Sequence, residues 1–276
     1  MPRILRLIKI KDVVTLFGSF FAIISIIMSI TGFSSGDEFY YVLACMFIFF
    51  SITTDTLDGW IARKFNQGGN DLGVEIDSLS DCIAFVAAPA ILMFCAYGGG
   101  FMFIAAGIFT MCGVLRLAWF NIEDTTEGYI GIVTPITAST LLAYFLTNYF
   151  YDQILIYGNE QIKQFYLPFH PFHLFLTNQW TVSIIMLLLG LSNLADFLRY
   201  DKRVRKKRGL WKYYIIIAGV SVIIMIILMN VAAYTYNNTL WAIIYIIVDI
   251  WSYCAFYACL AYIVWGFITW YRLRDE

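Results

Sequence analysis

The sequence predicts an all-α membrane protein, a polytopic bundle of about eight transmembrane helices preceded by an N-terminal interfacial helix. Two observations predict this class. Of the 276 residues, 61% are hydrophobic and 13% are charged, whereas a soluble domain of this length needs far more polar surface. The apolar residues also fall into long runs that can each cross about 30 Å of hydrocarbon at about 1.5 Å per residue.

The expected elements follow from these runs in order. Residues 1–11 alternate basic and apolar side chains, which is typical of a short interfacial helix on an anionic membrane face. Gly98-Gly99-Gly100 breaks the chain between the third and fourth spans, and residues 151–178 are expected to form a long aromatic-rich loop. The spans are expected at about 13–31, 39–62, 74–97, 101–120, 129–150, 179–197, 210–234 and 239–271.

The distribution of basic residues predicts the topology. Of the 18 lysines and arginines, only Lys163 lies in a loop assigned to the far side of the membrane. Because such residues collect on the cytoplasmic side, we expect a multi-pass cell-membrane protein with both termini in the cytoplasm. The basic run 202–208 is expected to touch anionic lipid headgroups, so membrane lipids and no nucleic acid are the expected contacts of this chain.

Four carboxylates interrupt the apolar pattern at one place. Asp55 and Asp58 are three residues apart, and Asp77 and Asp81 are four apart, so each pair lies on one face of a helix. The Gly-rich segment 66–73 between them is expected to be a turn. Two antiparallel helices would then bring all four charges together near the cytoplasmic face. A divalent cation, which prefers oxygen ligands, would relieve their repulsion.

The neighbouring residues suggest a substrate. Gly59 and Ala62 are small enough for a ligand to approach closely, and Arg63 could hold a phosphate. A metal would neutralise a diphosphate, and a carboxylate not used for coordination could deprotonate an attacking hydroxyl. These residues indicate metal-dependent phosphoryl or phosphatidyl transfer at a membrane surface. The alternative is a divalent-cation transporter, although a transport site is expected near the bilayer middle.

The same residues resemble a known family. The spacing of eight of them resembles the signature of the CDP-alcohol phosphotransferases: Asp55, Asp58, Gly59, Ala62, Arg63, Gly73, Asp77 and Asp81. Three further segments are similar to the phosphatidylserine synthase branch: IDSLSDCIAFVAAPA (76–90), RLAWFN (116–121) and GIVTPITA (131–138). Trp119 and Val133 stand where that branch usually has arginine and proline.

The resemblance implies a role for each group of site residues. It implies divalent metal, Mg²⁺ or Mn²⁺, on Asp55, Asp58 and Asp77, with Asp81 at the edge of the shell as the general base. The residues implied in CDP-lipid binding are Asp58, Gly59, Ala62, Arg63, Gly73 and Asp77. The residues expected around the acceptor are Asn66, Arg116, Thr134 and Pro135.

The resemblance also implies a domain organisation and a reaction. Residues 1–200 would form the six-helix core of a homodimer, and residues 201–276 a basic cytoplasmic loop with two additional helices. The expected reaction transfers the phosphatidyl or archaetidyl group of a CDP-linked lipid to L-serine and releases CMP. Glycerol phosphate and inositol phosphate are the alternative acceptors. Both carry an additional phosphate, and the few basic residues near the site favour serine: Arg63, Lys64 and Arg116.

Overall fold

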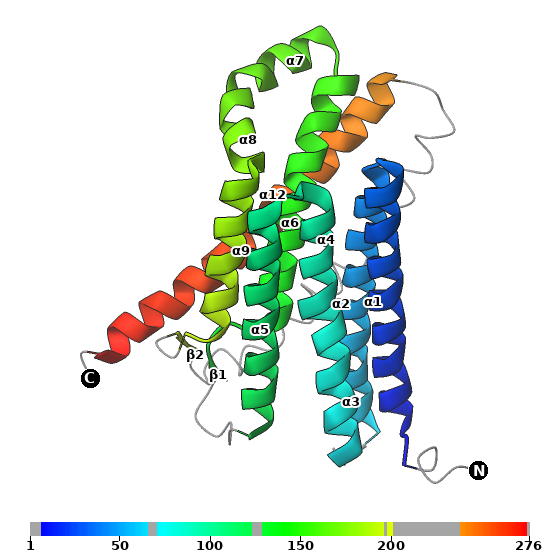
Figure 1. Ribbon diagram of the computed structural model, residues 1–276, viewed down its shortest axis with the longest axis vertical. Helices are drawn as coiled ribbons and strands as arrows, with labels where there is room; N and C mark the ends of the chain where they lie inside the picture. The colour runs from blue at the N-terminus through cyan, green and yellow to red at the C-terminus, as the bar shows by residue number, and fades with distance from the viewer. Residues whose placement is uncertain (1–6, 66–70, 123–128, 196–197, 201–237, 275–276) are drawn as a thin grey trace.

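Figure 1 shows the computed structural model of the chain, which describes residues 7–65, 71–122, 129–195, 198–200 and 238–274. In this part of the chain a single two-residue strand pair joins β1 (Tyr129–Ile130) to β2 (Arg199–Tyr200), and the other elements are helices. They are α1 (Ile10–Ser35), α2 (Phe39–Lys64), α3 (Asp71–Asp81), η2 (Cys82–Ala87), α4 (Ala88–Tyr97), α5 (Gly100–Ile122), α6 (Thr134–Tyr157), α7 (Glu160–Tyr166), η3 (Leu167–Phe169), α8 (His170–Thr177), α9 (Gln179–Asn193) and α12 (Asn238–Arg274). The prediction of an all-α bundle is confirmed.

The number of membrane spans is lower among these residues than the eight predicted. Five segments are long and apolar enough to cross a membrane: Ile10–Ser35, Phe39–Lys64, Asp71–Tyr97, Gly100–Ile122 and Trp241–Tyr271. The segments Glu160–Thr177 and Gln179–Asn193 meet at 61° and pass the same test together, as a sixth. The span predicted at 210–234 lies outside the described residues. The chain is an integral membrane protein, but a count of eight is not confirmed.

Helix α6 lies inside the bundle and packs against α12, α4, α9 and η2 (Figure 1). Leu141, Leu142, Leu146 and Phe150 are fully buried along it. It begins at Thr134, five residues later than predicted, because the chain turns at Gly131 with φ of 75° and a proline occupies the first turn of the helix. This helix is surrounded mainly by protein, so its polar residues face other helices rather than lipid.

The predicted loop over residues 151–178 is wrong, because this segment is helical. Helix α6 continues to Tyr157, and α7, η3 and α8 follow it. Asn159 caps α7 by accepting a hydrogen bond from the backbone N–H of Ile162 at 3.0 Å. Pro168 and Pro171 lie in the first turns of η3 and α8, where the missing proline N–H is tolerated.

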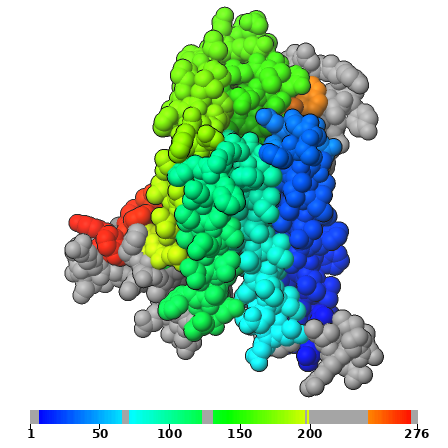
Figure 2. Space-filling model, viewed as in Figure 1, coloured from blue at the N-terminus to red at the C-terminus, as the bar shows by residue number. Residues whose placement is uncertain are grey.

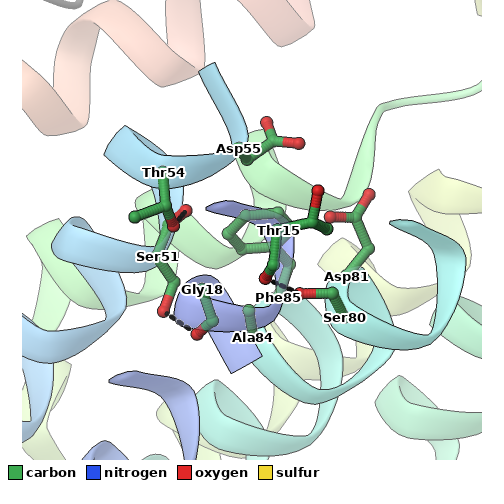
Figure 3. Close-up of a pocket in the computed structure, with 9 residues that line it drawn as sticks. All are labelled: Thr15, Gly18, Ser51, Thr54, Asp55, Ser80, Asp81, Ala84 and Phe85. Atoms are coloured by element: carbon green, nitrogen blue, oxygen red, sulfur yellow. Dashed lines mark hydrogen bonds between the residues drawn. The ribbon is translucent and has the colours of Figure 1, made fainter. Parts of the chain in front are cut away.

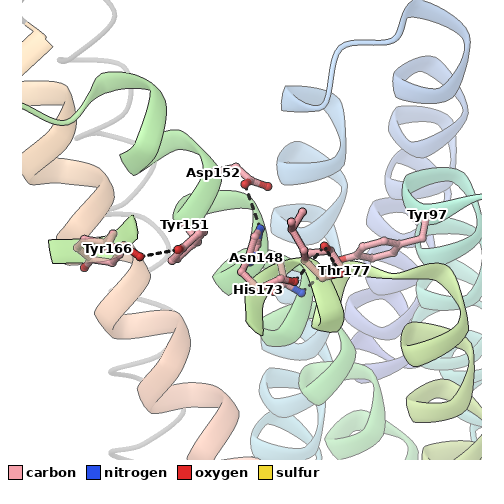
Figure 4. A network of polar contacts seen from close by, with 8 residues as sticks. Tyr97, Asn148, Tyr151, Asp152, Tyr166, His173 and Thr177 are labelled. Atoms are coloured by element: carbon pink, nitrogen blue, oxygen red, sulfur yellow. Dashed lines mark hydrogen bonds and ion pairs between the residues drawn. The ribbon is translucent and has the colours of Figure 1, made fainter. Parts of the chain in front are cut away.

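Polar contacts at the end of the bundle far from the N-terminus fasten these short helices (Figure 4). His173 Nε2 lies 3.0 Å from Asp152 Oδ1, and the His173 ring stacks on Tyr151 with 4.2 Å between ring centroids. The Tyr151 hydroxyl donates to the carbonyl of Tyr166 at 2.7 Å. These inward contacts leave the aromatic residues of α8 on the outside, where Phe172 is 63% exposed. His170 and His173 therefore lie on a helix rather than in the loop predicted over residues 151–178.

The first helix and the turns at its ends differ from the predictions in detail. Helix α1 begins at Ile10, so Lys11 of the predicted interfacial segment belongs to the first span, while residues 1–6 lie outside the described part. Helix α1 ends at Ser35, and Gly36, which follows it, has φ of 71°. The predicted break at the glycines after α4 is confirmed, since Gly98 and Gly99 have φ of 61° and 89°. Helix α1 packs along α2 and also against α3, η2 and α4.

The third predicted span consists of three consecutive helical segments. The turn predicted to reach Gly73 is wrong at its end, because α3 already begins at Asp71. Helix α3 is followed directly by the π-helix η2 and then by α4, whose first turn contains Pro89. Because Pro89 has no N–H to donate, the hydrogen-bond pattern of the helix changes before it. The π-helix begins immediately after Asp81.

Candidate functional site

Three of the four predicted aspartates come together where α2 meets α3. Asp55 lies on α2, and Asp77 and Asp81 lie on α3. One carboxylate oxygen of each lies within 4.8 Å of the others, and we call these three residues the carboxylate cluster. Asp55 and Asp81 point toward the same space in Figure 3. Two helices therefore bring together like charges that the sequence places 26 residues apart.

The carboxylate cluster fits a divalent cation. Such ions bind oxygen at about 2.0 to 2.6 Å, so two ligands on opposite sides of an ion are about 4 to 5 Å apart. The oxygens of the cluster lie within 4.8 Å of one another, which meets this limit. Three carboxylates at this separation also repel one another, and a cation between them would remove the repulsion.

Asp58 has a different environment from the other three aspartates. Its side chain is buried with 7% exposure, and its Oδ2 accepts a hydrogen bond from the Thr15 hydroxyl of α1. The sequence predicts a site formed by α2 and α3. In the structure α1 is a third helix that contacts the site. Thr15, Gly18 and Ser19 are small or polar residues with helical spacing inside an apolar span, and this pattern could have revealed the missing helix.

A small cavity lies directly beside the carboxylate cluster (Figure 3). Its volume is about 10 Å³, which is roughly the room that one water molecule needs. Hydroxyl groups and carboxylates form much of its wall. The lining residues are Thr15, Gly18, Ser51, Thr54, Asp55, Ser80, Asp81, Ala84 and Phe85.

Hydroxyl groups on all three helices hold the walls of this cavity together. The Ser51 hydroxyl of α2 donates to the carbonyl of Gly18 at 2.9 Å. The Ser80 hydroxyl of α3 donates to the carbonyl of Thr15 at 3.0 Å and accepts a hydrogen bond from Ser19 at 2.9 Å. Helix α1 is thus fixed to both helices that carry the aspartates.

Two residues near the start of α1 add charge to the site beyond that of the predicted aspartates. The side chain of Asp12 is 1% exposed, and its Oδ1 lies 3.2 Å from Lys11 Nζ. Its Oδ2 accepts the backbone N–H of Lys9 at 2.8 Å, which caps the helix. Lys11 is also close enough to Asp58 and Asp77 for electrostatic interaction. The site therefore includes a cation and a fifth carboxylate from α1.

The residues expected around the nucleotide lie on both sides of the cluster. Gly59 and Ala62 follow Asp58 along α2, and the Arg63 guanidinium lies over Gly59, where an added Cβ would be 3.4 Å from its Nη1. Arg63 is exposed, and Gly73 is buried on α3. The amino group of Lys64 instead lies over the Trp60 ring, at 4.5 Å from the centroid. Arg63 is thus the cation that folds back over Gly59.

The residues expected around the acceptor lie near the start of α6. Arg116 on α5 is buried with 6% exposure, and its Nε is 3.6 Å from the position of a Cβ added to Gly131. Thr134 and Pro135 form the first turn of α6, three residues further along the chain. The Ser78 hydroxyl of α3 donates to Asn121 Oδ1 of α5 at 3.0 Å, which links this region to the helix of Asp77. Asn66 lies outside the described residues.

Comparisons with known proteins agree in one family. Residues 9–175 match the CDP-alcohol phosphatidyltransferase family. A protein of Methanocaldococcus jannaschii named CDP-diacylglycerol–serine O-phosphatidyltransferase is 31% identical over 199 residues, which are 71% of this chain and 90% of that protein. The archaetidylserine synthase of Methanothermobacter thermautotrophicus is 31% identical over 54% of this chain and 62% of its own length. A CDP-diacylglycerol–serine O-phosphatidyltransferase of Helicobacter pylori is 34% identical over 46% of this chain and 55% of its own.

Proposed function

The chain belongs to the CDP-alcohol phosphatidyltransferase family, and from this premise we propose that it makes a serine phospholipid. The chain is a CDP-alcohol phosphatidyltransferase, and its acceptor is proposed to be the hydroxyl of L-serine. The names of the relatives support serine, because they are serine O-phosphatidyltransferases and an archaetidylserine synthase. The transferred group would be phosphatidyl or archaetidyl.

The single observation that carries the chemistry is the carboxylate cluster of Asp55, Asp77 and Asp81. We assign Asp55, Asp58 and Asp77 to a divalent metal, Mg²⁺ or Mn²⁺, with Asp81 at the edge of its shell. When bound, the metal would neutralise the diphosphate of the CDP-linked lipid and stabilise the leaving CMP. Residues of this chain would carry out the other steps of the reaction.

The CDP-lipid would lie along the ends of α2 and α3. We assign its binding to Asp58, Gly59, Ala62, Arg63, Gly73 and Asp77. Arg63 would donate charge-assisted hydrogen bonds to phosphate oxygens, and its position over Gly59 supports this assignment. The absence of a side chain at Gly59 would let the diphosphate approach the helix backbone.

Asp81 is proposed as the general base. The serine hydroxyl oxygen attacks the phosphorus that carries the lipid, and its proton passes to the Asp81 carboxylate. A new P–O bond to serine forms while the P–O bond to CMP breaks, and CMP leaves with the electron pair. Asp81 is held at the boundary of α3 and the π-helix, and π-helices are frequent at functional sites.

The acceptor pocket is proposed around Arg116, with Asn66, Thr134 and Pro135. The buried guanidinium of Arg116 could pair with the serine carboxylate. Glycerol phosphate and inositol phosphate remain the alternative acceptors, and each would need further cations for its additional phosphate. Serine requires a single cation, which Arg116 supplies.

The proposed function also includes a setting in the membrane. We propose that the site opens at the cytoplasmic face and that both termini are cytoplasmic, which the distribution of lysine and arginine supports. We further propose a homodimer, with residues 1–200 as the family core and residues 201–276 as an addition. A water-soluble alcohol and a lipid-anchored nucleotide can meet at such an interface.

An assay of CMP release tests this proposal. Purified protein in detergent is incubated with a CDP-linked lipid and Mg²⁺ or Mn²⁺, and with serine, glycerol 3-phosphate or inositol phosphate in parallel. We expect CMP release with serine and metal together, and none after chelation. Release with glycerol 3-phosphate but not with serine would overturn the acceptor, whereas no release with any alcohol would overturn the reaction.

A further inference from the structure

Asp58 occupies an unusual position for a residue that helps to bind a metal. It is not one of the three carboxylates whose oxygens lie within 4.8 Å of one another. One of its two oxygens, Oδ2, is already engaged by the hydroxyl of Thr15. The side chain is buried, so this hydrogen bond is not in competition with bulk water. Its orientation therefore depends on a residue of α1.

Thr15 is itself held in place by several contacts. Its backbone carbonyl accepts a hydrogen bond from the Ser80 hydroxyl at 3.0 Å, and Ser80 is the neighbour of Asp81. Its own hydroxyl can donate either to Asp58 or, at 3.1 Å, to the carbonyl of Lys11. A carboxylate is the stronger acceptor of the two, so the proton is expected on the Asp58 side. Thr15 thus connects the helix of Asp58 to the helix of Asp77 and Asp81.

We propose that Thr15 is a positioning residue that holds Asp58 ready for the divalent cation. This inference rests on the proposed function in one respect, because it assumes that the aspartates bind a metal. The Thr15 hydroxyl engages Oδ2 of Asp58 and thereby fixes the direction in which the carboxylate points. Residues that orient metal ligands in this way commonly change metal affinity by 10- to 100-fold when they are replaced.

The alternative is that the hydrogen bond only fastens α1 to α2. Thr15→Val separates the two roles, because valine keeps the shape of threonine and removes the hydroxyl. Thr15→Ser restores the hydroxyl without the methyl group. Thr15→Ala is the second variant without a hydroxyl, in case valine interferes with folding. A matched control is Thr31→Val on the same helix, since the Thr31 hydroxyl donates to its own helix at Ile27, 2.8 Å away, and is exposed.

The test is a Mn²⁺ titration of the purified full chain in detergent, followed by electron paramagnetic resonance without any substrate. We expect the Kd for Mn²⁺ to rise at least about 10-fold in Thr15→Val and Thr15→Ala. Thr15→Ser and Thr31→Val should keep the wild-type value. The melting temperature without metal is measured for each variant to show that it is folded.

A double-mutant cycle shows whether Thr15 acts through Asp58. If it does, Thr15→Val should have no further effect on Mn²⁺ binding in an Asp58→Ala background, in which no side-chain oxygen is left for Thr15 to orient. An unchanged or lower Kd in Thr15→Val would overturn the proposal, as would an equal effect in both backgrounds. Wild-type protein that binds no Mn²⁺ would overturn both this proposal and the metal assignment.

The titration separates this inference from the reaction. If Thr15→Val weakens Mn²⁺ binding while the wild-type protein releases no CMP with any alcohol, the reaction is wrong and the role of Thr15 stands. If CMP release requires metal but Thr15→Val binds Mn²⁺ normally, the reaction stands and the role of Thr15 is wrong.

Discussion

At the scale of single residues, the four aspartates of the candidate site have two kinds of environment. The family resemblance implies that Asp81 is the outer member of the group. In the structure an oxygen of Asp81 lies within 4.8 Å of oxygens of Asp55 and Asp77. Asp58 is outside this cluster and instead accepts a hydrogen bond from Thr15. Spacing along a helix predicts which face a residue occupies, but the hydrogen-bond partner comes from another helix. The roles of the four residues stay predictions.

The first prediction concerns Asp81. Asp81→Asn keeps the size of the side chain but removes its ability to accept a proton at neutral pH. We expect CMP release to fall by about 10² to 10⁴-fold, the usual contribution of a general base. Mn²⁺ binding should be largely kept. Full transferase activity in this variant would contradict the assignment of Asp81 as the base.

The second prediction concerns Arg63, which folds over Gly59. Hydrogen bonds to charged groups contribute about 1.5 to 3 kcal/mol. Arg63→Ala should therefore raise the KM for the CDP-lipid by about 10- to 100-fold. The matched control is Lys64→Ala, because Lys64 lies over the Trp60 ring instead. Equal KM values for the two variants would count against a specific phosphate contact at Arg63.

At the scale of secondary structure elements, α1 is the helix whose role was least evident. The aspartates lie on α2 and α3, yet α1 packs on both and contributes Thr15 and Gly18 to the wall of the cavity. This close approach requires Gly18, where an added Cβ would lie 2.8 Å from Thr54 Oγ1. Glycine in a membrane helix commonly permits such contacts between helices.

The third prediction follows from that distance. Gly18→Ala should push α1 away from α2, lower the melting temperature and weaken Mn²⁺ binding. The cost of overpacking is typically about 1 to 3 kcal/mol. Gly107→Ala is the control, since a Cβ added there meets no atom within 4 Å. If Gly18→Ala has the same melting temperature and the same Kd for Mn²⁺ as Gly107→Ala, the prediction is wrong. The Thr54 side chain can then move aside without loss of stability or metal binding.

The fourth prediction concerns α8, which rests on α6 through His173 at the end of the bundle opposite the aspartates. His173→Ala removes the contact with Asp152 and the stacking on Tyr151. We expect a lower melting temperature with an unchanged Kd for Mn²⁺. Lys163→Ala should leave both values unchanged, because its pair with exposed Glu160 is 4.0 Å long and solvated. A change in Mn²⁺ affinity in His173→Ala would reveal coupling between the two ends.

At the scale of the whole molecule, the two ends of the bundle have different chemistry. The start of α1 and the helix α3 lie at one end, and α7 lies at the other (Figures 1 and 2). The carboxylate cluster therefore belongs to a single end of the bundle rather than to its middle. A site at one end suits a transferase that meets a soluble alcohol at the membrane surface better than it suits a transporter.

The fifth prediction tests the orientation of the bundle. In a background with the six native cysteines replaced by alanine, Lys163→Cys should react with a membrane-impermeant maleimide in intact cells. Phe65→Cys, at the end of α2, should react only after the membrane is permeabilised. CMP release by the cysteine-free protein is measured first, to show that it is folded. The reverse labelling pattern would place the aspartates on the outer face.

The sequence by itself determined the class of the protein and singled out the four aspartates as candidates for the site. The composition and the length of the apolar runs reflect the preference of each residue for lipid or water. These preferences can be judged from the sequence without a structure. The helical spacing of Asp55, Asp58, Asp77 and Asp81 is equally local. These four aspartates, which carry the resemblance to the family, also lie within the residues that match the family.

Only the tertiary structure decided which helices meet. The hydrogen bond from Thr15 to Asp58 joins residues 43 positions apart. The local pattern of small and polar residues on α1 indicates a closely packed helix, but it does not indicate which residue Thr15 contacts. Helix α6 is another case, because its buried Asn148 donates to the Tyr97 hydroxyl of α4 at 3.3 Å, a contact that hydropathy does not predict. The same applies to α8, whose buried His173 is satisfied by Asp152 of α6. In each case the deciding energy lies between helices, so it becomes visible only when the helices are packed together.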